Sequence, residues 1–273
     1  MDFLISDEQK QLQDLIHQFI QKDYPFDVRE KLVKTEEGFS KDFWKTFSQF
    51  GLLAMPFSEE DGGFNGGPVD VMIILEAFGT GLIVEPYIPN IVLSGNLVSK
   101  LGSKEQKEAI LPNLLNGDMQ LAFAFSEPQS RFDLNDVTTS AEKNGEGYKL
   151  NGYKSVVMNG PAADKLIVSA RTAGSQLDEN GISLFIVDRD ADGVSLRDYS
   201  NVDGSKASEL TLENVVLPKE ALLGDQNKAF STIEEVVNLA TLAISAEAIG
   251  IMQKMNELTL ESVSYTHLTL PTT

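Results

Sequence analysis

The sequence has no cysteine and only two histidines in 273 residues. The absence of cysteine excludes disulfide bonds, thiolate metal sites and a cysteine nucleophile. The histidines, His17 and His267, lie far apart in the chain, and neither has a metal-ligand partner at helical spacing. We therefore expect neither a metal site nor a Ser-His-Asp hydrolase.

Basic residues are also scarce, with 22 lysines and arginines against 41 aspartates and glutamates and a formal net charge of −19. An acidic chain is a poor match for nucleic acid, whose recognition depends on clustered positive charge. The N-terminus lacks the basic segment and apolar run of a signal peptide, and no uninterrupted apolar stretch predicts a membrane span. These features predict a cytoplasmic protein with no nucleic-acid partner.

Apolar residues recur at helical spacing over the first part of the chain and again from Phe230 to Glu261. Two Ser-x-x-Gln patterns, which begin at Ser6 and Ser103, have the form of capping boxes and predict helix starts. The glycine-rich stretch 62–67 is no phosphate loop, because it lacks Gly-Lys-Ser/Thr and a preceding strand. The pattern predicts a helical domain over residues 1–118.

From Met119 onward, short apolar runs are separated by glycine turns, which is typical of a small antiparallel β-barrel. The first run has to stop near Pro128, since proline donates no ladder hydrogen bond. The Asn151-Gly152 pair predicts a type I′ hairpin turn. The following run could then return beside the first, so that two strand ends form a flat site. A plain barrel wall without a ligand is the alternative on these residues alone.

The same stretch resembles the flavin-binding middle domain of the acyl-CoA dehydrogenase family. That family has a run close to Ala-Phe-Ala-(Ser/Thr)-Glu-Pro and later a Gly-x-x-Tyr-x-Leu-Asn-Gly-x-Lys segment. This chain has a matching run that ends at Pro128 and a second match over 146–154. Three further short matches follow in the family order: Asn159-Gly160, Ala163-Asp164 and the triplet 169–171. Flanking matches extend the resemblance over about residues 1–261.

The resemblance implies an α+β multidomain fold. Residues 1–118 would form an N-terminal helical domain, and 119–224 a small antiparallel β-barrel that binds flavin. Residues 225–261 would form the first helix of a C-terminal helical bundle that is otherwise missing. The tail 262–273 departs from the family pattern and is expected to be foreign sequence.

The resemblance also implies FAD-dependent α,β-dehydrogenation of an acyl-CoA thioester, a dicarboxyl-CoA among the options. An electron-transfer flavoprotein or a similar acceptor would take the electrons, and the chain would form a homo- or hetero-oligomer with a related chain. In the family a glutamate of the C-terminal bundle is usually the general base, so no residue of this chain is assigned that role. Glu127 lies in the core motif and is assigned a structural role.

Seven flavin-contacting positions are implied by the match, and three of them depart from the family pattern. Phe132 replaces a serine, Met158 replaces a hydroxyl residue, and Val156 replaces a tryptophan. These departures resemble the small subunit of heteromeric pimeloyl-CoA dehydrogenases. Two alternatives therefore stay open: a non-catalytic partner subunit of the same fold, and an unrelated β-barrel ligand-binding module. The implied positions are Phe123, Phe125, Ser126, Phe132, Val156, Val157 and Met158.

Overall fold

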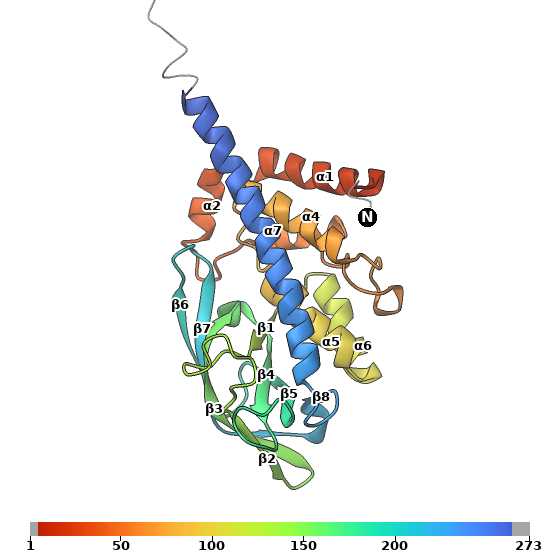
Figure 1. Ribbon diagram of the computed structural model, residues 1–273, viewed down its shortest axis with the longest axis vertical. Helices are drawn as coiled ribbons and strands as arrows, with labels where there is room; N and C mark the ends of the chain where they lie inside the picture. The colour runs from red at the N-terminus through yellow and green to blue at the C-terminus, as the bar shows by residue number, and fades with distance from the viewer. Residues whose placement is uncertain (1–4, 264–273) are drawn as a thin grey trace, which may run out of the picture.

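The computed structural model describes residues 5–263, and its first half is helical, as predicted (Figure 1). The expected foreign tail lies outside the described residues except for Ser262 and Val263, which continue the last helix. The helical elements are α1 (Asp7–Asp23), α2 (Phe26–Leu32), α3 (Lys41–Gln49), η1 (Glu59–Asp61), α4 (Pro68–Gly81), the π-helix η2 (Ile88–Gly95), α5 (Asn96–Leu101) and α6 (Lys104–Leu115).

Helices α1 and α6 begin where the capping-box patterns predict. In both, the N-cap serine accepts a hydrogen bond from the third residue of the helix, and that residue's glutamine reaches back to the cap. Each box pairs two backbone amides that the helix itself leaves free. These two predictions are confirmed.

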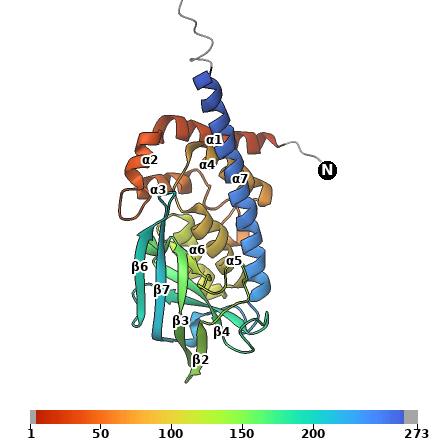
Figure 2. The ribbon, with the colours of Figure 1, turned by 60° about the vertical axis from the view of Figure 1, so that its left-hand side comes forward.

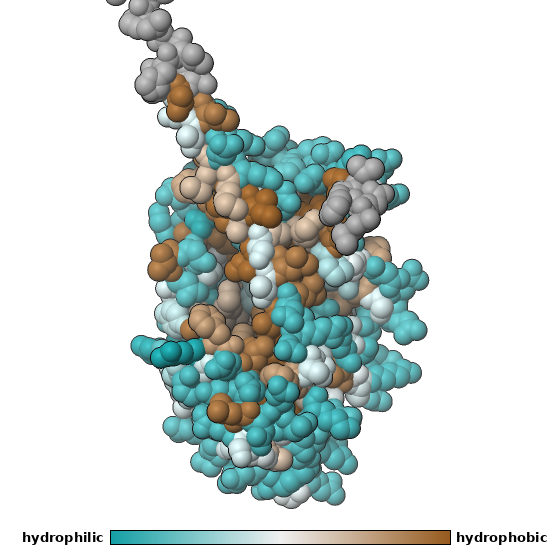
Figure 3. All heavy atoms as spheres, viewed as in Figure 1, coloured by the Kyte–Doolittle hydropathy of each residue, from teal (hydrophilic) through white to brown (hydrophobic). Residues whose placement is uncertain are grey.

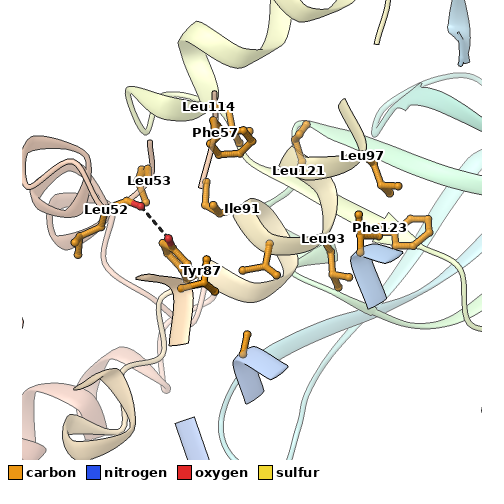
Figure 4. Packing of buried hydrophobic residues seen from close by; sticks show 14 of the residues in the cluster. Leu52, Leu53, Phe57, Tyr87, Ile91, Leu93, Leu97, Leu114, Leu121 and Phe123 are labelled. Atoms are coloured by element: carbon orange, nitrogen blue, oxygen red, sulfur yellow. Dashed lines mark hydrogen bonds between the residues drawn. The ribbon is translucent and has the colours of Figure 1, made fainter. Parts of the chain in front are cut away.

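A cluster of aromatic and aliphatic side chains forms the core of the helical domain (Figure 4). Phe47 stacks on Phe78 with ring centroids 5.0 Å apart. The buried Tyr87 donates its hydroxyl to the carbonyl of Leu52 at 2.9 Å, so its polar end is satisfied. The same cluster includes Phe123 of the first strand, and this shared core fixes the helical domain against the sheet.

The β-domain is one sheet of eight strands that carries a second, internal core (Figure 2). Neighbouring strands run in the order β6-β7-β3-β2-β4-β5-β8, and β1 pairs with β4. The strands are β1 (Leu121–Ala124), β2 (Ser140–Asn144), β3 (Gly147–Met158), β4 (Lys165–Arg171), β5 (Ile182–Asp188), β6 (Val194–Ser200), β7 (Lys206–Leu217) and β8 (Leu222–Leu223); short 3-10 turns η3 (Gly160–Ala162) and η4 (Lys219–Ala221) connect them.

The structure corrects two details of the predicted sheet. The Asn151-Gly152 pair is no turn, because both residues lie inside the continuous strand β3, and the hairpin turn comes earlier, between Asn144 and Gly147. Gly152 is needed for a close approach instead: a Cβ atom there would lie 2.5 Å from the hydroxyl of Thr139. The sheet is also mixed, since β1 runs parallel to β4 and does not pair with β3 as an antiparallel neighbour.

Helix α7 (Phe230–Val263) runs along both domains and crosses α4 at very short range (Figures 1 and 2). A Cβ atom on Gly79 would lie 2.1 Å from the carbonyl oxygen of Glu247, and one on Gly250 would lie 1.9 Å from that of Glu76. The two glycines are therefore what allows the backbones to meet. By length and mean hydropathy α7 could also cross a membrane, but one such helix is weak evidence, and here it packs on α4.

Helix α7 carries a series of large apolar side chains that are exposed in the described structure (Figure 3). The residues are Leu242, Ile244, Ile249, Met252, Met255, Leu258, Leu260 and Val263. An apolar surface of this kind marks a place where further protein packs.

Candidate functional site

The first part of the site is formed where β1 ends and β3 passes beside it. Strand β1 ends at Ala124, and the next two residues, Phe125 and Ser126, leave the ladder as predicted. The amide of Ser155 donates to the carbonyl of Ser126 at 2.9 Å, which fixes the two segments side by side. We call this edge, made of Phe125, Ser126, Val156 and Met158, the platform.

The seven predicted positions do not all face the same way. Val156 and Met158 have exposed fractions of 49% and 36%, whereas Val157 between them is fully buried in the core of the β-domain. Phe123 is also buried, with its ring stacked on that of Phe125 at 4.8 Å. Neither Val157 nor Phe123 therefore presents its side chain to a ligand at the platform.

Phe132 lies on the loop after β1, and its side chain is 97% exposed. The preceding residue, Arg131, has a φ of 49°, a backbone conformation that turns the loop sharply. Among the described residues, four predicted positions thus lie on the two joined segments, and Phe132 lies on the exposed loop that follows β1. Its role at a flavin stays a prediction.

Val156 has an unusual backbone conformation for its residue type. Its φ is 52°, and the register between β3 and β7 shifts at this point, between Lys154 and Val157. A β-branched residue rarely adopts positive φ, and such outliers cost about 1–3 kcal/mol and gather at functional sites. The bulge turns the side chain of Val156 outward and exposes it on the platform.

A fully buried ion pair holds the platform in place. Lys154 of β3 donates to Glu127 at 2.7 Å, and both side chains have zero exposure. The other ammonium protons of Lys154 reach Ser169 Oγ at 3.0 Å and the carbonyl of Phe125 at 3.5 Å. Glu127 in turn accepts hydrogen bonds from the backbone amides of Thr138 and Thr139 at 2.9 and 3.0 Å.

The ion pair is charged at neutral pH. Burial alone would raise the pKa of Glu127, but the charge of Lys154 and the hydrogen bonds from Lys154 and Thr138 hold it well below its usual range. The carboxylate is thus a structural acceptor that ties β1, β3 and the loop before β2 together. This agrees with the structural role assigned from the sequence.

We predict that Lys154→Met destabilises the fold by about 3–5 kcal/mol, because it leaves a buried carboxylate without its cation. Lys165→Met is the matched control, since it removes a more exposed ion pair and should cost about 1 kcal/mol or less. Urea unfolding measures both. The double variant Glu127→Gln/Lys154→Met should lose less unfolding free energy than the two single variants lose together. Strict additivity would show that the two groups are not coupled.

A cavity of about 470 Å³ opens beside the platform. Its walls come from the platform residues Phe125 and Met158, from the segment 82–89 after α4, from α7, and from the β6–β7 hairpin. Most of the lining side chains are apolar, which suits an acyl chain better than a polar ligand. The cavity therefore joins both domains and α7 in one site.

Glu247 of α7 also lines this cavity, and the sequence interpretation did not select it. It has no hydrogen bond or ion pair to any described residue. Burial raises its pKa to about 7, and the charge of Asp203 adds to the rise. The signal was present in the sequence, because Glu247 interrupts the apolar stripe of α7 three residues after Ile244 and four before Ile251. Burial likewise raises the pKa of Glu85, which lies in another wall of the cavity, to about 7.

We predict that Glu247→Gln stabilises the protein at high pH. The folded-state pKa of Glu247 lies above its unfolded value, so its native state binds the proton more tightly. The stability it contributes is complete below the unfolded pKa and is lost as pH rises through about 7. The free energy of unfolding of the variant should exceed that of the parent by about 1–3 kcal/mol at about pH 8 and by much less near pH 5. Urea midpoints at both pH values test this, with Glu234→Gln on the exposed side of α7 as control. An equal gain at both values would contradict it.

The comparisons with known proteins agree with this arrangement. The family model described as "Acyl-CoA dehydrogenase, N-terminal domain" matches residues 6–118, and that described as "Acyl-CoA dehydrogenase, middle domain" matches residues 122–215. The acryloyl-CoA reductase (NADH) of Anaerotignum propionicum is 31% identical over 273 residues, which cover 98% of this chain and 68% of the relative. The chain belongs to the acyl-CoA dehydrogenase family.

Two further relatives are informative. Caffeyl-CoA reductase-Etf complex subunit CarC of Acetobacterium woodii is 29% identical, with 91% of this chain and 66% of the relative covered. The solved structure of butyryl-CoA dehydrogenase from Megasphaera elsdenii superposes with a TM-score of 0.82 at 27% identity, over 94% of this chain and 69% of that one. The chain spans 63–66% of the length of the first curated relatives it matches.

Proposed function

We propose that this chain is the FAD-binding part of a subunit that oxidises an acyl-CoA thioester to its α,β-unsaturated product. The observation that carries the proposal is the platform, which opens directly into the largely apolar cavity beside it. The alternative of an unrelated β-barrel module is set aside, since the family match spans the helical domain and the sheet.

The platform residues fit the ring portion of a flavin. The exposed Val156 and Met158 and the half-buried Phe125 supply an apolar edge for a planar ring, and the half-buried Ser126 adds a hydroxyl that has no protein partner among the described residues. When bound, FAD supplies the acceptor for the hydride. The protein positions the thioester, excludes water from the cavity and holds the ring by these contacts.

The family pattern would supply two further hydroxyls, one on the platform at Met158 and one on the loop after β1 at Phe132. Each missing hydrogen bond weakens ligand binding by about 1 kcal/mol. This specific observation favours a second candidate function, a partner subunit that binds flavin weakly and supports a related, active chain. A turnover measurement distinguishes the two.

None of the carboxylates that line the cavity belongs to the platform: Glu37 and Glu85 come from the helical side, Asp203 from the hairpin tip and Glu247 from α7. We therefore propose that the group which removes the α-proton lies outside these 273 residues, in a continuation of the chain or in a related chain. The exposed apolar face of α7 supports packing of such protein. An electron-transfer flavoprotein or similar acceptor completes the proposal, supported by the relative named as part of an Etf complex.

We predict that the chain binds FAD and that Ser126→Ala weakens binding by about fivefold, because the loss of one hydrogen bond costs about 1 kcal/mol. Met158→Thr restores a hydroxyl and should strengthen binding or leave it unchanged. Fluorescence titration with FAD measures the dissociation constants. Ser245→Ala on α7, away from the platform, is the control. If neither the chain alone nor the chain with a related subunit takes up flavin, the proposed function fails.

We predict that the 273-residue chain alone gives no dye reduction with short, medium or dicarboxyl CoA thioesters, because no carboxylate lies at the platform. Co-expression with a related chain should restore turnover, and light scattering should then show a complex larger than either chain. Turnover by the isolated chain at the rate of the complex would contradict the placement of the base.

A further inference from the structure

The cavity has two chemically different ends. Phe125 and Met158 mark the platform end. In the sheet, Met158 pairs with Ala207, next to Lys206 where β7 begins. Asp203 lies beyond the start of that strand, in the turn of the β6–β7 hairpin. We call this part of the cavity wall the far end.

Hydrogen bonds from Arg29 of α2 hold this far end together. Its guanidinium donates to the carbonyl of Asp203 at 2.7 Å and to that of Leu82, after α4, at 2.9 Å. Arg29 thereby joins the helical domain to the hairpin tip. It forms no ion pair with a described carboxylate, and it lines the cavity.

Glu247 lines the same cavity as Asp203, and the charge of Asp203 acts on its carboxyl group. Apolar cavity residues of α7, Ile244 and Ile251, flank Glu247 one turn to either side. A carboxylate in such surroundings is costly unless something pairs with it.

The backbone of Glu247 is fixed by the helix crossing, which keeps this residue in the cavity wall. Its carbonyl packs against Gly79, and Gly250 brings α7 equally close to α4 on the next turn. Glu247 thus starts from a fixed backbone position in a cavity wall, and its carboxylate has an unused capacity for hydrogen bonding.

The charges around the cavity indicate which ligand group this carboxylate suits. Four acidic residues line it, and only two basic ones do, so the surroundings favour a hydrogen-bond donor or a cation over an anion. The acidic residues are Glu37, Glu85, Asp203 and Glu247, and the basic ones are Arg29 and Lys206. A dicarboxylic acyl group is therefore a poorer match than one that ends in a donor.

We infer that Glu247 is a specificity-determining residue that accepts a hydrogen bond from a hydroxyl or amine carried on the distal part of the acyl chain. The inference rests on the proposed function, because it takes the platform end as the end where the thioester reacts. It names a substrate class that the family match does not give: acyl groups with a distal donor.

The test is calorimetric titration of the folded 273-residue chain, in the presence of FAD, with four CoA thioesters. These are octanoyl-CoA, ω-hydroxyoctanoyl-CoA, ω-aminooctanoyl-CoA and the ω-carboxyl analogue suberyl-CoA. The hydroxyl and amine ligands should bind about tenfold more tightly than octanoyl-CoA, the gain of one hydrogen bond to a charged group. Suberyl-CoA should bind most weakly.

Two substitutions separate charge from hydrogen bonding. Glu247→Gln keeps an acceptor oxygen, so the hydroxyl preference should persist while the amine preference falls. Glu247→Leu should abolish both preferences and tighten octanoyl-CoA binding. Glu234→Gln, on the exposed side of the same helix, should change neither.

Each other outcome has a defined meaning. Binding of all four thioesters with equal affinity, unchanged in Glu247→Leu, would overturn the inference and leave the proposed function standing. A preference for suberyl-CoA would also overturn it, since Arg29 would then be the recognition group. Failure of every thioester and of FAD to bind would count against the proposed function and the inference together.

Discussion

The ion pair between Glu127 and Lys154 is the constraint on which the platform depends. Two charges with zero exposure are stable together only when their remaining hydrogen-bonding capacity is met. Here Lys154 also donates hydrogen bonds to Ser169 and to the carbonyl of Phe125. Glu127 also accepts hydrogen bonds from backbone amides of the loop before β2. The pair thereby fixes the end of β1 beside β3. Its own net contribution to stability is small beside its effect on position, because desolvation offsets much of the attraction.

Local sequence rules predicted the features that local chemistry determines. The capping boxes at Ser6 and Ser103 are built from residues three apart, and the end of β1 ahead of Pro128 follows from the missing proline donor. Family resemblance then gave the domain order and four residues that do share one edge. Each of these features depends on a short stretch of chain and its immediate neighbours.

The features that could not be predicted depend on distant segments. Asn151-Gly152 has the composition of a hairpin turn, but pairing with β7 and the close approach of Thr139 hold it inside a strand. The parallel pairing of β1 with β4 joins segments that are far apart in the sequence, Leu121 with Lys165 and Ala124 with Val168. Glu247 is a partial case: its break in the apolar stripe of α7 is visible in the sequence, but only the tertiary structure shows that this face of the helix lines a cavity.

The cavity exists only because three separate parts of the chain meet. The platform belongs to the sheet, the segment 82–89 belongs to the helical domain, and α7 closes the space between them. Gly79 and Gly250 set the distance at which α7 crosses α4, and this crossing holds the part of α7 that carries Glu247 in the cavity wall. The near end is set independently by the ion pair. Changes in acyl selectivity could therefore arise at the α4–α7 crossing without disturbing the residues that would hold the flavin, which is how one fold can serve relatives with different acyl groups.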